Sequence, residues 1–254
     1  MDDNAMKSHI AQTWSAEAGY YDNHVSHGVQ TDEEKKLWME VFSALLPGNA
    51  LHILDVGCGT GAMGLILAGM GHTVAGIDLS EGMMAIGRKK AEEQNLPMTF
   101  LTGDAEHPPF EPETFDAVIN RHLLWTLPHP ETALASWHRV LKPRGVVMVI
   151  DGVWDDGSFG AKVRRGVSSG IARIVEAHPH GDKGYSDEVR AALPNLGGVP
   201  EETARRYLTD AGFGDIAVQD LARIRENQRK RLKWYEKINP RGTYYLISGR
   251  KGIE

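Results

Sequence analysis

The chain has 254 residues, of which 41% are hydrophobic and 24% are charged, and its formal net charge is -6 at pH 7. This length suits one domain with insertions, and the acidic balance gives no overall attraction to nucleic acid or to an anionic membrane. We find no apolar run of membrane-spanning length and no leader-like start, so we expect a cytoplasmic protein with no membrane partner.

Residues 2–46 are polar, with apolar residues at helical spacing, and they predict two helices. The first covers HIAQTWSAEAGYYD and the second covers TDEEKKLWMEVFSALL. Pro47 and Gly48 then end the segment.

A glycine-rich turn within residues 51–64, LHILDVGCGTGAMG, organises the rest of the chain. A short apolar run ends at Asp55, three glycines follow at alternate positions (Gly57, Gly59 and Gly61), and an apolar stretch of helical spacing comes next. This order predicts a strand, a tight loop and a helix whose N-terminus favours an anionic group. The loop also satisfies the dinucleotide-binding fingerprint, so by itself it does not identify the cofactor. We interpret Cys58, the only cysteine, as a small residue that fills the turn.

Two further strands end in acidic residues. Residues 72–80 predict a strand that ends at Asp78, residues 81–95 a helix, and residues 98–104 a strand that ends at Asp104. A carboxylate at Asp78 can accept hydrogen bonds from both ribose hydroxyls of a nucleoside cofactor. Asp55, Asp78 and Asp104 therefore mark three successive strand ends.

The middle of the chain continues the alternation of strands and helices. Residues 115–121 and 146–152 predict strands, and residues 130–141 predict the amphipathic helix between them. Five strands separated by helices imply a parallel sheet, with the ligand crevice beyond the carboxyl ends of the strands. The glycine loop, Asp78, Asp104 and residues 120–125 should converge there.

The last hundred residues begin with a glycine-rich stretch, 153–200, which predicts a substrate-binding insertion with one helix at 166–177. His178 and His180 lack further ligand spacing, so we favour a solvated loop over a metal site. Residues 200–213 predict a helix, and residues 214–221 and 243–251 predict an antiparallel strand pair. The basic connection 221–237 is consistent with either RNA contact or a solvated helix face.

The motif DVGCGTG, together with Asp78, Asp104 and the segment 115–152, resembles class I S-adenosylmethionine-dependent methyltransferases. The resemblance implies an α/β, Rossmann-like, doubly wound sheet of seven mostly parallel strands with the last strand antiparallel. It also implies an N-terminal helical lid at 1–47, a cofactor-binding core at 48–152, the insertion at 153–200, and a C-terminal part at 201–254 that completes the sheet.

The same resemblance implies site residues. Those expected to bind S-adenosylmethionine are Asp55, Gly57, Cys58, Gly59, Gly61, Asp78, Leu79, Met83, Asp104, Ala105, Asn120 and Arg121. Candidates for substrate contact are Tyr20, His24, His27 and Trp125, and the catalytic candidates are His122 and Tyr21. His122 is the candidate base because the ordinary histidine pKa lies near neutral pH. An orienting or cofactor-binding histidine is an equal alternative.

These features predict an enzyme that transfers a methyl group to nitrogen or oxygen of a small-molecule acceptor by in-line displacement. Three alternatives stay open: an RNA or protein methyltransferase that uses the basic segment 221–237, a dinucleotide oxidoreductase, and a non-catalytic cofactor-binding protein. The sequence leaves open the acceptor and whether the chain forms a homodimer.

Overall fold

The computed structural model describes residues 1–155, 158–160, 163, 166–167, 170–171, 184–238 and 242–253. Seven strands form one sheet in the order β3-β2-β1-β4-β5-β7-β6. Their bounds are β1 His52–Val56, β2 Thr73–Asp78, β3 Met98–Thr102, β4 Phe115–Arg121, β5 Leu141–Gly152, β6 Gly214–Asp220 and β7 Tyr244–Arg250. β7 is antiparallel to β5 and β6, and the other neighbouring pairs are parallel. The predicted fold is confirmed.

The α-helices are α1 Asp3–Tyr21, α2 Asp32–Leu45, α3 Gly64–Gly69, α4 Glu81–Gln94, α5 Pro130–Val140, α7 Asp187–Ala192, α8 Glu201–Asp210 and α9 Ala222–Arg231. Local sequence explains their ends. The side chains of Thr31 and Ser80 accept hydrogen bonds from N–H groups in the first turns of α2 and α4. Asn95 ends α4 in the left-handed conformation, and α5 begins with a proline.

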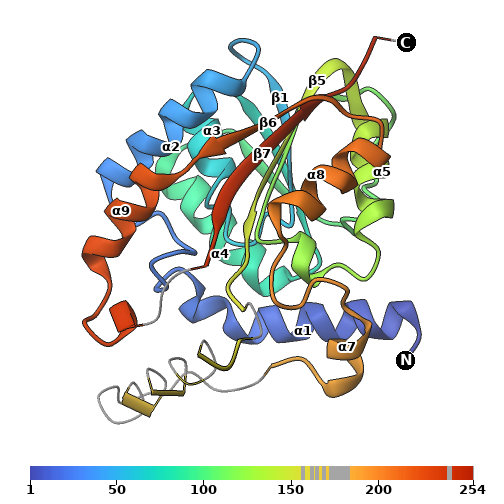
Figure 1. Cartoon of the computed structure of the whole chain (residues 1–254). Coiled ribbons are helices and arrows are strands. Elements are labelled where there is room, and N and C mark those ends of the chain that lie inside the picture. Colours follow the sequence, from blue (N-terminus) through green and yellow to red (C-terminus); the bar gives the residue numbers. More distant parts are fainter. Residues whose placement is uncertain are drawn as a thin grey trace.

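Helices cover both faces of the sheet (Figure 1), with α2, α3 and α9 on one face and α5 and α8 on the other. One hydrophobic core lies beneath each layer. Trp38, Phe42 and Leu67 anchor the first core, Trp137 and Leu134 anchor the second, and all five side chains are fully buried. A sheet buried on both faces explains why the central strands are almost continuously apolar.

Helix α1 lies across the end of the sheet at which the parallel strands finish (Figure 1). It is covered in turn by α7, where Val189 and Leu193 pack with Ile10 in a small third core. The helix α2, by contrast, belongs to the layer on the face of the sheet, because its Trp38 and Phe42 are part of the main core. We therefore keep the hypothesis of a lid for α1 alone.

The basic connection between the last two strands contains α9, which ends at Arg231 rather than at residue 237. Ile224 on α9 and Tyr235 beyond its end are both buried. Most of the helix predicted at 166–177, and both His178 and His180, lie outside the described residues. Within the described ranges, no helix combines the length and apolar character needed to cross a bilayer.

A buried ion pair joins α2 to α9. Glu34 is fully buried, its Oε2 lies 2.5 Å from Arg231 Nη2, and its Oε1 accepts a 2.7 Å hydrogen bond from Gln228. We expect Glu34→Ala to lower the free energy of unfolding by about 3 kcal/mol, because it leaves the largely buried guanidinium of Arg231 without a carboxylate. The measurement is urea unfolding followed by circular dichroism.

Glu33→Ala is the matched control in the same helical turn. Its carboxylate is 67% exposed and lies 4.0 Å from Lys230 Nζ. This substitution should change stability by less than about 1 kcal/mol. Equal losses for the two variants would show that the buried pair contributes nothing specific.

Candidate active site

The glycine loop after β1 is held by two carboxylates. Asp55 Oδ2 accepts a 2.9 Å hydrogen bond from Gly64 N–H, and Asp78 Oδ2 accepts a 2.8 Å bond from Gly59 N–H. Gly57 and Gly59 have φ values of 64° and 51°, which disfavour a side chain. A Cβ at Gly57 would also lie 2.6 Å from a methyl carbon of Leu123. The loop conformation therefore requires glycine.

Asp78 borders a cavity at the carboxyl end of β2. Its Oδ1 accepts a 2.8 Å hydrogen bond from Ser80 N–H, so each carboxylate oxygen is anchored by one backbone donor. Burial raises the pKa of Asp78, and these N–H donors oppose that shift. Each oxygen keeps acceptor capacity for a ligand hydroxyl.

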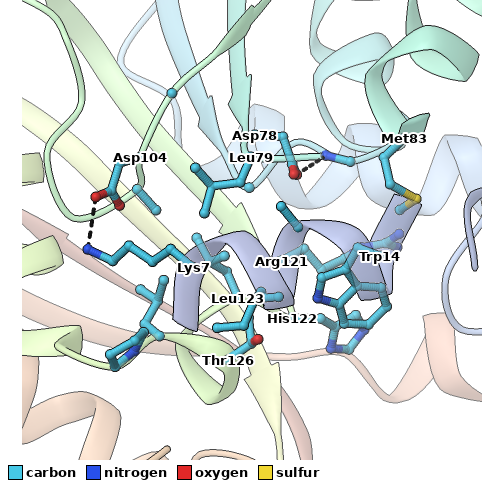
Figure 2. A pocket seen from close by; sticks show the side chains of 18 of the residues that line it. Lys7, Trp14, Asp78, Leu79, Met83, Asp104, Arg121, His122, Leu123 and Thr126 are labelled. Atoms are coloured by element: carbon cyan, nitrogen blue, oxygen red, sulfur yellow. Dashed lines mark hydrogen bonds and ion pairs between the residues drawn. The ribbon is translucent and has the colours of Figure 1, made fainter. Parts of the chain in front are cut away.

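Asp104, beyond the end of β3, borders the other side of the cavity, and Figure 2 shows Lys7 reaching it from α1. Lys7 Nζ lies 2.9 Å from Asp104 Oδ2, 2.5 Å from Glu106 Oε2 and 2.9 Å from Asp3 Oδ2. Burial by itself lowers the pKa of Lys7, but hydrogen bonds to these three carboxylates raise it overall. The sequence analysis missed Lys7, because one lysine in a polar helix carries no local signal.

The cavity has a volume of about 740 Å³, its open part included. It brings together ten of the predicted site residues: Tyr21, Gly57, Gly59, Asp78, Leu79, Met83, Asp104, Ala105, Arg121 and His122. Residues from α1 complete the wall, namely Lys7, Ile10, Ala11 and Trp14. A cavity of this size at the carboxyl ends of parallel strands is typical of a cofactor site.

The other predicted site residues lie outside the lining. Asp55, Cys58, Gly61 and Asn120 are buried and do not line the cavity. The Cys58 Sγ would lie 2.8 Å from a Cβ at Gly76, which fits its interpretation as a packing residue, and burial raises the pKa of its thiol. Tyr20 is 57% exposed and faces solvent.

His24 and His27 belong to an aromatic cluster beside the cavity, in which Tyr21 and Trp14 connect them to Trp125. His27 stacks on Tyr21 with ring centroids 4.4 Å apart and lies 5.0 Å from His24. Trp125 meets Trp14 edge-on at 5.9 Å. Burial raises the pKa of Tyr21, so its hydroxyl stays protonated at neutral pH.

Arg121 ends β4 and His122 follows it, at the point where the cavity meets this cluster. His122 has φ +56°, a left-handed conformation that is uncommon for residues other than glycine and recurs at functional sites. Arg121 Nη2 donates to the His27 carbonyl, while Arg121 Nη1 and His122 Nε2 are buried and have no hydrogen-bond partner among the described residues. Such atoms are ready to bind a ligand.

The ordinary histidine pKa, on which the choice of His122 as candidate base rested, does not apply to His122 in this fold. Burial, together with the positive charge of Arg121, lowers the pKa of His122 to about 3, against a hydrogen bond to the Ser26 backbone that raises it. Burial disfavours the charged imidazolium, and this effect cannot be read from the position of a histidine in the sequence. His122 is therefore neutral at physiological pH.

A family described as a methyltransferase domain matches residues 54–149. The chain is 29% identical over 194 residues to a demethylmenaquinone methyltransferase of Clavibacter sepedonicus, which covers 73% of this chain and 75% of that protein. It is 34% identical over 148 residues to a ubiquinone/menaquinone biosynthesis C-methyltransferase of Roseobacter denitrificans. That match covers 56% of this chain and 58% of that protein.

Two solved structures have a similar fold. The [4+2]-cyclase SpnF has a TM-score of 0.67 at 19% identity, covering 98% of this chain and 97% of that one. The phosphoethanolamine N-methyltransferase 2 of Haemonchus contortus, in complex with S-adenosyl-L-methionine, has a TM-score of 0.60 at 18% identity, covering 89% and 54%. At these identities the likeness concerns the fold alone.

Asp78→Asn should weaken the binding of S-adenosylmethionine at least about tenfold, because the amide keeps one acceptor oxygen and loses the charge. The measurement is isothermal titration calorimetry. Asp116→Asn is the control: Asp116 accepts hydrogen bonds from Lys142 and from His52 N–H outside the cavity lining. Unchanged affinity in a folded Asp78→Asn protein would contradict a ribose contact.

Asp55→Asn should remove part of the pH dependence of stability. Burial raises the pKa of Asp55 to about 7 from 3.8, despite the Gly64 N–H donor. The folded protein then holds a proton that the unfolded chain releases, so stability falls by about 1.4 kcal/mol per unit as pH rises from about 4 to 7. Urea midpoints at pH 5 and 7.5 measure this slope.

Asp151 supplies an internal reference for that slope. Burial raises its pKa to about 8, and it remains in both proteins. The difference between wild type and Asp55→Asn therefore isolates Asp55. If the stability of the two proteins changed equally with pH, Asp55 would be shown to be ionised in the folded protein.

Proposed function

This chain is a class I S-adenosylmethionine-dependent methyltransferase, and from that premise we propose that its acceptor is a small aromatic molecule carrying a hydroxyl group. The methyl group would go to the hydroxyl oxygen or to the ring carbon that the hydroxyl activates. The observation that carries the proposal is the pair formed by Arg121 and neutral His122, each with an unsatisfied nitrogen in the described part of the site, within an aromatic cluster.

The residues of the first cavity fit the cofactor. Asp78 would hold the ribose hydroxyls, Asp104 and the Ala105 N–H would hold the adenine, and the glycine loop would hold the methionine end. All of these except part of the loop line one cavity, and the Asp78 carboxylate is already oriented by two backbone donors. When bound, S-adenosylmethionine supplies an electrophilic methyl group for in-line displacement.

Arg121 would stabilise an ionised acceptor hydroxyl. Its Nη2 is fixed by the His27 carbonyl, while Nη1 points to no partner among the described residues. A preorganised cation in a site shielded from water stabilises developing negative charge strongly. The same charge disfavours a cationic amine, which is why we favour oxygen or carbon over nitrogen.

His122 Nε2 would accept the hydrogen bond of the acceptor hydroxyl and pass its proton on to solvent as the hydroxyl oxygen takes the methyl group, so the imidazole would be neutral again after the transfer. An imidazole with a pKa of about 3 is neutral at pH 7, so Nε2 can accept a hydrogen bond but binds a proton weakly. The names of the relatives in Clavibacter and Roseobacter support a quinone-type ring as the acceptor.

Helix α1 would act as the lid of the cofactor site. Lys7 ties it to Asp104 and Glu106, and Ser15 Oγ lies 2.8 Å from Ser80 Oγ. RNA is a less suitable acceptor, because Arg223 and Arg231 of α9 are paired with carboxylates of α2. These ion pairs reduce the charge that α9 presents to phosphates.

The test supplies methyl-labelled S-adenosylmethionine with 1,4-dihydroxynaphthalene, catechol, histamine, and RNA and protein fractions of a cell extract, and identifies products by mass spectrometry. We expect label on an aromatic hydroxyl compound. Label on histamine, RNA or protein alone would contradict the proposal. Cofactor binding without any labelled product would favour a non-catalytic protein.

Arg121→Met should lower kcat on the labelled acceptor about 100-fold, the cost typical of removing one electrostatic donor, and should leave the Kd for S-adenosylmethionine nearly unchanged. Arg139→Met is the control, since Arg139 donates to the Pro108 and Phe110 carbonyls outside the cavity lining. A weaker Kd with an unchanged kcat would show instead that Arg121 binds the cofactor carboxylate.

A further inference from the structure

A second cavity adjoins the first at His122, which lines both. It lies between the end of β5, the start of β7 and helix α9, and its volume is about 500 Å³, its mouth included. Its wall includes Ser26, Trp154, Arg225 and Tyr244. A methyl donor and its acceptor must meet at one point, and His122 is the point that these two cavities share.

The inner part of this second cavity is aromatic. Tyr244 stacks on His122 with ring centroids 5.4 Å apart and an interplanar angle of 22°. Trp154 meets His122 edge-on at 6.2 Å and Trp125 at 5.3 Å. Flat rings at these angles provide faces and edges on which another planar ring packs favourably.

Two buried polar atoms in the same place lack a partner within the described ranges: the Tyr244 hydroxyl and His122 Nε2. A buried hydroxyl without a partner is costly, so it is seldom kept where nothing binds to it. One atom can donate and the other can accept, which matches the two roles of a phenolic hydroxyl.

Helix α9 supplies a fixed outer wall for this cavity. Arg225 Nη2 donates a 2.7 Å hydrogen bond to the Gly242 carbonyl, and Gln228 Nε2 donates to the buried carboxylate of Glu34. Both side chains line the cavity. The basic segment thus has a structural role at this cavity.

We propose that the second cavity is the acceptor site, and that it takes a planar aromatic ring whose hydroxyl group bonds to Tyr244 and His122. The proposal rests on the proposed function for its chemistry and shares His122 with it, but it places the acceptor ring in a second cavity, against Tyr244. The acceptor enters beside α9 and β7, while the cofactor occupies the cavity beneath α1.

The test is calorimetric titration of 1-naphthol into the protein saturated with S-adenosylhomocysteine. Tyr244→Phe should weaken the binding of 1-naphthol about tenfold, the effect of one hydrogen bond. The folding stability of the variant protein should be unchanged or higher than that of wild type. Naphthalene, which lacks the hydroxyl, should bind wild type and Tyr244→Phe equally. A purely structural role of the tyrosine would not produce this dependence on the ligand hydroxyl.

Tyr245→Phe is the matched control at the next position of β7. Its hydroxyl donates a 2.8 Å hydrogen bond to the Val199 carbonyl on the other face of the sheet. This variant should lose thermal stability and keep its affinity for 1-naphthol, the reverse of Tyr244→Phe.

Three results would overturn the acceptor site: no binding of 1-naphthol to wild type, equal binding to Tyr244→Phe, or displacement of S-adenosylhomocysteine by 1-naphthol. The titration measures binding and does not depend on methyl transfer. Failure of the acceptor site can therefore be told apart from failure of the proposed function. Binding that depends on Tyr244 without methyl transfer to any aromatic hydroxyl would support the site and overturn the proposed activity.

Discussion

The carboxylates that end or adjoin the first two strands hold the element on which the rest of the site depends. Asp55 and Asp78 each accept a hydrogen bond from a backbone N–H of the glycine loop or the helix after it. These bonds fix a loop whose left-handed glycines have little conformational preference of their own. With the loop fixed, the cavity wall is set before any ligand arrives, which reduces the entropy lost on binding.

The cavity is completed by a helix that comes before the sheet in the chain. Lys7 connects α1 to Asp104 and Glu106, and Ile10 packs against α7. Lys7 lies within ion-pair distance of three carboxylates, those of Asp3, Asp104 and Glu106. These ion pairs connect Asp104, the predicted adenine contact, to the helix that covers the cavity. A displacement of α1 would therefore remove Lys7 from Asp104 and Glu106.

The proposed cofactor site and the proposed acceptor site meet at the end of β4. Arg121 and His122 follow each other in sequence, yet their surroundings differ: Arg121 is held by the His27 carbonyl, and His122 lies between two cavities. Burial, with the guanidinium charge as a second cause, lowers the pKa of His122 and keeps its imidazole neutral. One short segment thus places a cation and a neutral hydrogen-bonding ring where a donor and an acceptor would meet.

The sequence by itself determined the succession of strands and helices along the chain, the glycine loop and the acids at Asp55, Asp78 and Asp104, because each depends on residues only a few positions apart. Only the tertiary structure decided the partner of Lys7, the pKa of His122, the place of α2 in the helical layer and the second cavity. Lys7 and Asp104 are 97 positions apart, and Gln228 and Glu34 are 194 apart. Such contacts, and the burial that shifts a pKa, arise when the sheet assembles and carry no local pattern.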